Sequence, residues 1–182
     1  MKGIIFNLLE QVVSDKYGEA TWDSLLETTG LEGAYTAVGS YEDEELMKLV
    51  GAACEALDSD PDDLVRWFGR TSFPLLAAKY PSFFEGHTTT RTFLLTLNDV
   101  IHPEVRKLFP GAYAPAFDFA ETAGDSLGLA YYSHRHLCSF AEGLIEGAAD
   151  HFGESVSIEQ PECGKRGDER CLLVTTFNGA NA

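Results

Sequence analysis

Three residues in alternate positions, Tyr131, Ser133 and Arg135, combine two hydroxyls with a guanidinium. On a β-strand this spacing places all three side chains on one face, in line with the apolar positions Leu127 and Leu129. A guanidinium is a rigid fork of donors that pairs with a carboxylate or phosphate through two hydrogen bonds, and the hydroxyls add further donors. The pattern predicts an anion clamp. A strand edge with exposed polar side chains is the alternative interpretation.

A histidine in an apolar segment changes the balance between these interpretations. His102 lies within residues 90–108, where apolar residues recur at helical spacing and predict a long helix. Taken alone, such a His is more often a hydrogen-bonded core residue than a metal ligand. An anion clamp together with a His on an apolar helix is what haem requires, because propionates need the clamp and iron needs an axial nitrogen.

The chain resembles a known family, the H-NOX (haem–nitric oxide/oxygen binding) domains, relatives of the haem domain of soluble guanylate cyclase. The resemblance rests on Tyr131-x-Ser133-x-Arg135, on His102 and on the opening segment MKGIIF, and it extends over the whole chain. It implies haem b (iron protoporphyrin IX), with His102 on the iron and the clamp on the propionates. Pro115 matches a family proline pressed against the porphyrin, and a strand-entry proline is the alternative interpretation. The other pocket positions that the resemblance implies are all apolar: Ile5, Leu9, Pro74, Phe140 and Leu144.

The resemblance implies a haem-based gas sensor and no enzyme activity. Some family members that hold oxygen have a Tyr at the position of Phe140, and Phe has no hydrogen to donate. Losing that hydrogen bond costs on the order of 1–3 kcal/mol, or about tenfold or more in affinity. The pocket is therefore expected to bind nitric oxide and carbon monoxide and to exclude oxygen. Release of the Fe–His102 bond would carry the signal to a separate protein, in this family a histidine kinase or a cyclic-di-GMP enzyme.

Three of the four cysteines are expected to converge in the C-terminal part of the chain: Cys138, Cys163 and Cys171. In some family members the matching cysteines bind zinc, with a His where this chain has Gln160. Gln is a poor zinc ligand, so either His151 or Glu162 is the candidate for the fourth zinc ligand. Free or redox-active thiols are the alternative.

Composition excludes several classes of partner. The 13 Lys and Arg against 29 Asp and Glu give a net charge of −16, which argues against nucleic acid and anionic membranes. The sequence has no apolar run long enough to span a membrane and no signal peptide, so we expect a cytoplasmic protein. A partner with a basic surface would suit this charge.

Periodicity predicts an α+β fold, with a helical N-terminal half followed by a four-stranded antiparallel sheet and a long helix, and with haem between the two halves. We expect one domain over residues 1–182, made of an N-terminal helical subdomain (1–60) and a part with the haem-anchoring helices and the sheet (61–182). Pro74 is expected to kink or break the helix that begins at Pro61, and Pro103 to bend the helix at His102. A hairpin turn is predicted at residues 123–125.

Two other functions are weighed against the gas sensor. Hydrolysis is disfavoured because Ser133 and His134 would point to opposite strand faces, and no Gly-x-Ser-x-Gly motif or nucleotide-binding glycine loop is present. A zinc/thiolate redox-sensing module without a functional haem would explain the cysteines but would leave His102 unexplained.

Overall fold

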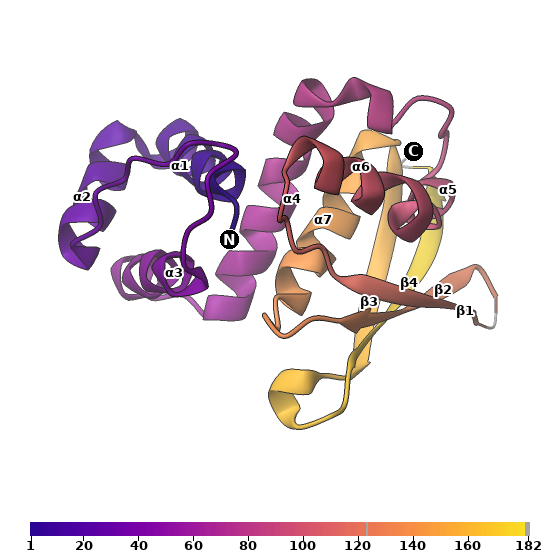
Figure 1. Ribbon diagram of the computed structural model, residues 1–182. Helices are drawn as coiled ribbons and strands as arrows, with labels where there is room; N and C mark the ends of the chain where they lie inside the picture. The colour runs from indigo at the N-terminus through magenta and orange to yellow at the C-terminus, as the bar shows by residue number, and fades with distance from the viewer. Residues whose placement is uncertain (123, 181–182) are drawn as a thin grey trace.

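The computed structural model describes residues 1–122 and 124–180, with helices in the N-terminal half and a sheet at the end. Three helices form an N-terminal group, at the left of Figure 1: α1 (Gly3–Tyr17), α2 (Glu19–Thr29) and α3 (Asp43–Leu57). This group packs around its own apolar cluster, which includes Phe6, Trp22 and Leu49. The predicted α+β class is confirmed.

Helix α4 (Pro61–Lys79) stands between the N-terminal group and the rest of the chain (Figure 1). Its start is as predicted, because the Asp60 side chain accepts a hydrogen bond from the Asp62 backbone at 2.8 Å. Of the two effects expected of Pro74, a kink or a break, the break is wrong, since α4 continues through it. Proline removes one backbone hydrogen bond, and packing along a neighbouring helix can offset that loss.

That neighbouring helix is α7 (Cys138–His151), which lies side by side with α4. Glycine permits the close approach, because an ideal Cβ on Gly143 would lie 2.0 Å from the carbonyl oxygen of Arg66. Ion pairs connect the two helices, Arg66 to Glu146 at 2.6 Å and Arg70 to Asp150 at 2.7 Å. The pair α4–α7 therefore forms a fixed wall behind the sheet.

The single helix predicted over residues 90–108 was wrong, because the segment is divided. A 3₁₀ turn, η1 (Pro81–Phe83), precedes it, and it consists of α5 (Thr90–Leu94), the π-helical turn η2 (Leu97–Ile101) and α6 (His102–Leu108). His102 itself is helical, with φ −66° and ψ −37°. Pro103 lies in the first turn of α6, where a missing N–H costs little. The wide turn lies immediately before His102 and includes Asp99, the residue whose carbonyl Pro103 cannot bond.

The sheet is antiparallel throughout, with strand order β1-β2-β4-β3. Its strands are β1 (Ala116–Glu121), β2 (Ser126–Tyr132), β3 (Glu154–Glu162) and β4 (Cys171–Ala180), with a short turn η3 (Gly164–Arg166) before the last. The four predicted strands are confirmed. In the predicted turn between β1 and β2, Ala123 lies outside the described residues, and Gly124 has the φ of +73° that favours glycine.

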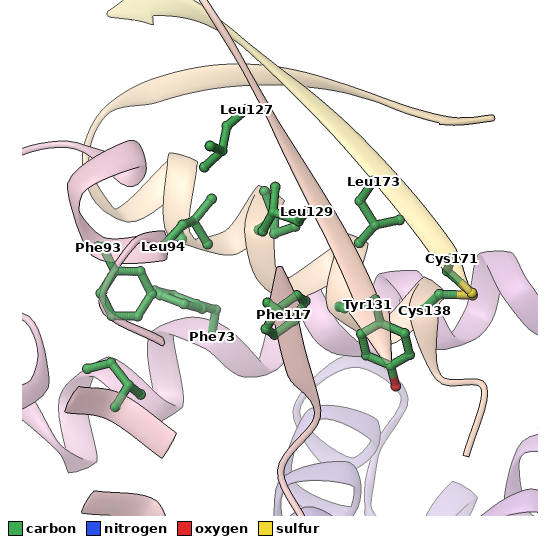
Figure 2. Close-up of a cluster of buried hydrophobic side chains, with 14 of the residues drawn as sticks. Phe73, Phe93, Leu94, Phe117, Leu127, Leu129, Tyr131, Cys138, Cys171 and Leu173 are labelled. Atoms are coloured by element: carbon green, nitrogen blue, oxygen red, sulfur yellow. The ribbon is translucent and has the colours of Figure 1, made fainter. Parts of the chain in front are cut away.

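A second apolar cluster lies between the sheet and the helices that cover it (Figure 2). Its labelled members come from α4, α5, β1, β2, α7 and β4, including Phe73, Phe93, Phe117 and Leu173. Within the described part of the chain, no helix combines the length and apolarity needed to cross a membrane.

Candidate functional site

A cavity of about 460 Å³ lies between the N-terminal helices, the α4–α7 pair, the His102 segment and the sheet. This volume is within the usual range for small-molecule sites. Most of its lining is apolar and aromatic, contributed by α1, α3, α4, α6, α7, β1 and β2, and polar groups gather at few points. Such a cavity suits a large apolar ligand with a small number of polar attachments.

His102 supplies one of these polar points, from the first residue of α6. Its ring stacks on Phe117 of β1, with centroids 5.9 Å apart and planes at 27°. The Nδ1 atom is buried and has no hydrogen-bond partner. A core histidine normally satisfies its buried nitrogen, so this arrangement argues against a purely structural role.

The protonation state of His102 also suits ligation. Burial, reinforced by the charge of Arg106, lowers the pKa of His102 to about 4, while the Pro115 backbone acts weakly in the opposite direction. The imidazole is therefore neutral at pH 7, which is the form that binds a metal ion. Pro115 lines the same cavity immediately before β1 begins.

The three residues predicted to form an anion clamp come together at one cavity, but not along one strand. Strand β2 ends at Tyr132, so Tyr131 projects from the strand while Ser133 and Arg135 lie in the turn after it. The Ser133 hydroxyl oxygen accepts a hydrogen bond from the Arg135 backbone at 3.2 Å, which stabilises that turn. All three residues line the cavity. The expectation of a single strand face was wrong because the chain leaves the sheet here to enter α7.

Tyr131 and Arg135 both present hydrogen-bond donors near the cavity. Burial raises the pKa of Tyr131 to about 12, so its hydroxyl stays protonated, and Figure 2 shows the oxygen pointing out of the apolar cluster. The Arg135 guanidinium lies over the ring of Tyr113 at 5.0 Å and donates to the Tyr113 carbonyl at 3.1 Å. These groups can bind an anionic substituent of a ligand, such as a carboxylate, at the edge of the cavity.

Asp43, at the start of α3, was not recognised from the sequence as a site residue. Its Oδ2 lies 2.6 Å from Arg135 Nε, and its Oδ1 lies 2.6 Å from the amine of Met1. Although burial alone would raise it, these two cations hold the pKa of Asp43 below its usual range. In the sequence Asp43 is one of several acids at a helix start, so nothing distinguishes it.

The apolar residues expected around the ligand separate into two groups. Ile5, Phe140 and Leu144 line the 460 Å³ cavity, and Phe140 packs on Phe68 with ring centroids 5.1 Å apart. Leu9 instead borders a smaller cavity of about 60 Å³ within the N-terminal helices. Pro74 does not contribute to the lining among the described residues.

Tyr80 is a further hydroxyl on the cavity wall that the sequence did not single out. It follows the last residue of α4, 12 residues after Phe68, which corresponds to about 18 Å along the helix. Its ring stacks on Phe83, with centroids 5.6 Å apart. Phe68 and Tyr80 therefore lie far apart along the α4 wall, and Phe140 packs beside Phe68.

The predicted convergence of three cysteines is confirmed in the geometry. The Sγ atoms of Cys138, Cys163 and Cys171 lie within 4.8 Å of one another, and all three residues are buried free thiols. Cys163 Sγ is 3.9 Å from each of the other two sulfurs, and Figure 2 shows those of Cys138 and Cys171 side by side. Three sulfurs at this spacing can act as ligands of one soft metal ion.

The residues proposed for a fourth ligand are engaged elsewhere. His151 packs against Phe84, with ring centroids 5.1 Å apart, and Glu162 pairs with Arg170 at 2.9 Å. An imidazole that the sequence analysis did not consider borders the cluster: an ideal Cβ on Gly164 would lie 3.0 Å from Nδ1 of His136. The same point would lie 3.9 Å from the sulfur of Cys171.

Comparisons with known proteins agree on one family. The family described as Haem-NO-binding (HNOB) matches residues 2–160. The soluble guanylate cyclase gcy-31 of Caenorhabditis elegans is 28% identical over 164 residues, which cover 87% of this chain and 23% of that protein. The chain thus spans about a quarter of the length of this curated relative.

Solved structures of H-NOX proteins share the fold. The S. oneidensis protein in the Fe(II)NO state is 32% identical, with a TM-score of 0.93 and coverage of 98% of this chain and 100% of that one. A triple mutant of the same protein in the Fe(II) state reaches 0.94 at the same identity, over 100% and 98% of the chains, and its Fe(II)CO state reaches 0.89 over 98% and 99%. The unliganded Fe(II) protein of K. algicida is 29% identical, with a TM-score of 0.89 over 100% and 99%.

Proposed function

The chain belongs to the Haem-NO-binding (H-NOX) family of haem-based gas sensors, and on that premise we propose that it binds haem b in the 460 Å³ cavity and senses nitric oxide. The observation that carries this proposal is the His102 imidazole, which is neutral, lines the cavity and has an unpartnered Nδ1. The residues present fit the group. His102 would hold the iron from one side, and Tyr131, Ser133 and Arg135 would hold the propionates at the mouth.

Bound haem would supply a ferrous iron able to bind a diatomic gas. The residues of the chain would decide which gas stays. Phe140 and Leu144 on α7 and Ile5 on α1 are apolar and offer no hydrogen to a bound gas. Oxygen on ferrous iron needs such a donor more than nitric oxide or carbon monoxide does. We therefore infer binding of nitric oxide and carbon monoxide with exclusion of oxygen.

The position of His102 at a helix start suggests how the signal leaves the site. Because His102 is the first residue of α6, a change in its contact with bound haem would move α6, and Ile5 and Pro115 line the same cavity. Because Asp43 and Arg135 join α3 to the clamp, movement at the cavity would reach the N-terminal group. The net charge of −16 suits a separate partner with a basic surface, such as a histidine kinase or a cyclic-di-GMP enzyme.

A direct test is reconstitution with haem followed by absorption spectroscopy. The expected result is one haem per chain, with a Soret band that moves with nitric oxide and with carbon monoxide and stays in place in air. A protein that remains colourless in excess haem would contradict the proposal. A stable oxygen adduct in air would contradict only the gas selectivity.

The cysteine cluster supports a second, independent candidate property, a structural zinc ion held by Cys138, Cys163 and Cys171. The Gly164 N–H donates to the sulfur of Cys171 at 3.3 Å, which is the kind of contact that stabilises a thiolate. Metal analysis of protein purified without chelator should give one zinc per chain, and Cys163→Ser should lose it. Protein free of metal, with three titratable thiols, would favour the redox interpretation instead.

A further inference from the structure

The Asn98 side chain attaches the segment that carries His102 to the edge of the sheet. Its Nδ2 donates to the carbonyl of Phe117 at 2.5 Å, and its Oδ1 accepts from the N–H of Phe117 at 3.2 Å. Strand β1 is an edge strand, so this outward backbone pair has no neighbouring strand. An amide side chain carries one donor and one acceptor side by side, which matches the N–H and C=O of a single strand residue.

The local helix geometry brings Asn98 and His102 to the same strand. In η2 the N–H of Ile101 bonds to the carbonyl of Thr96 at 3.1 Å, and the N–H of His102 bonds to that of Leu97, both five residues back. A π turn of this kind is wider than an α turn and often occurs at functional positions. Asn98 contacts the backbone of Phe117, and the ring of His102 stacks on the side chain of the same residue.

We propose that Asn98 is a positioning residue for the iron ligand, which fixes the His102 imidazole relative to β1 and forms the pivot about which α6 moves. This inference rests on the proposed function and deepens it. Asn98 and His102 both contact Phe117, so the strand fixes the position of the imidazole in the cavity wall while His102 is bound to the iron. When His102 leaves the iron, the Asn98 end of the segment stays on the strand and the α6 end turns.

If Asn98 had a purely structural role, it would stabilise the fold without affecting the iron–histidine bond. Vibrational spectroscopy of that bond therefore distinguishes a structural role from a positioning role. In the haem-loaded ferrous protein, Asn98→Ala should lower and broaden the iron–histidine stretching band. Release of histidine after addition of nitric oxide should become about tenfold faster, the factor that corresponds to loss of roughly 1.4 kcal/mol of hydrogen bonding. The neighbouring Asp99 is exposed, and Asp99→Ala should leave both quantities as in the unmodified protein.

A second variant and a second measurement keep the inference testable if Asn98→Ala does not fold. Asn98→Asp keeps the acceptor for the Phe117 N–H and loses the donor, so it should shift the band in the same direction by less. Amide exchange at Phe117, followed by NMR, should accelerate at least about tenfold in Asn98→Ala and stay unchanged in Asp99→Ala.

The outcomes separate the inference from the function on which it rests. Faster exchange at Phe117 with an unchanged iron–histidine band would make Asn98 merely structural and would overturn the inference. Unchanged exchange would overturn it as well, because the two hydrogen bonds would then not hold the segment. Unmodified protein that takes up no haem would instead contradict the proposed function.

Discussion

The Nε of Arg135 lies 2.6 Å from Oδ2 of Asp43, although the two residues are 92 positions apart in the sequence. Arg135 belongs to the turn after β2, and Asp43 begins α3, so this ion pair joins the sheet to the N-terminal helices. The second oxygen of Asp43 binds the amine of Met1. A ligand carboxylate that enters the clamp must therefore share or displace a contact that also holds α1 and α3 in place.

The first prediction concerns retention of haem by this clamp. Arg135→Ala should release haem faster than Ser133→Ala, because a charge-assisted hydrogen bond contributes roughly 1.5–3 kcal/mol and a neutral one about 1 kcal/mol. Transfer of haem to an excess of an apo haem acceptor measures both rates. Equal rates in the two variants would show that the guanidinium does not hold a propionate.

The second prediction concerns gas selectivity at Phe140. Phe140→Tyr places a hydroxyl on the wall of α7 beside Phe68, and it should raise the affinity for oxygen by about tenfold or more. Phe84→Tyr is a matched control, since Phe84 also lines the cavity but stacks on Phe93 at the other side. Spectra in air should change for Phe140→Tyr alone. An oxygen adduct in both variants would show that the position of the hydroxyl in the cavity does not decide oxygen binding.

The third prediction follows from the lowered pKa of His102. In the haem-free protein the folded His102 has a pKa of about 4, whereas an unfolded His has about 6.5, so the unfolded state binds more protons between these values. Stability should therefore fall as pH decreases from about 6.5 to 4, by on the order of 3 kcal/mol from this residue. His102→Leu should lose that component. Urea unfolding at several pH values tests it, and parallel curves for the two proteins would contradict it.

The fourth prediction concerns the wall formed by α4 and α7. Gly143→Ala would place a methyl group against the Arg66 carbonyl, and overpacking of this kind costs about 1–3 kcal/mol or more. Gly51 of α3 has open space at its Cβ position, so Gly51→Ala should stabilise the protein by about 0.4–1 kcal/mol. Thermal unfolding should move in opposite directions for the two variants. A tolerated Gly143→Ala would mean that the two helices are not closely packed there.

Sequence patterns predicted most of the fold because they depend on local chemistry. Pro61 marked the start of α4, and the periodicity of the C-terminal half indicated the sheet. Patterns could not show that residues 90–108 divide, because apolar spacing in a π turn resembles that in an α-helix. They also could not show that α4 passes through Pro74, which depends on packing against α7.

For the candidate site, the sequence identified residues by type but not their long-range partners. His102 and Arg135 stood out because each is unusual in its surroundings. Asp43 and His136 did not, since their importance depends on contacts made only in the folded chain. Asn98 was overlooked because a polar residue in a helical segment normally faces solvent, whereas here it completes the edge of a sheet.

The most direct test of the central claim is the identity of the iron ligand. Haem-loaded protein and a His102→Gly variant should be compared by absorption and resonance Raman spectroscopy, without and with added imidazole. The account predicts that the variant loses the iron–histidine band, that imidazole restores a five-coordinate ferrous spectrum, and that nitric oxide releases the added imidazole. An unchanged iron–histidine band in His102→Gly would show that another residue holds the iron and would contradict the account.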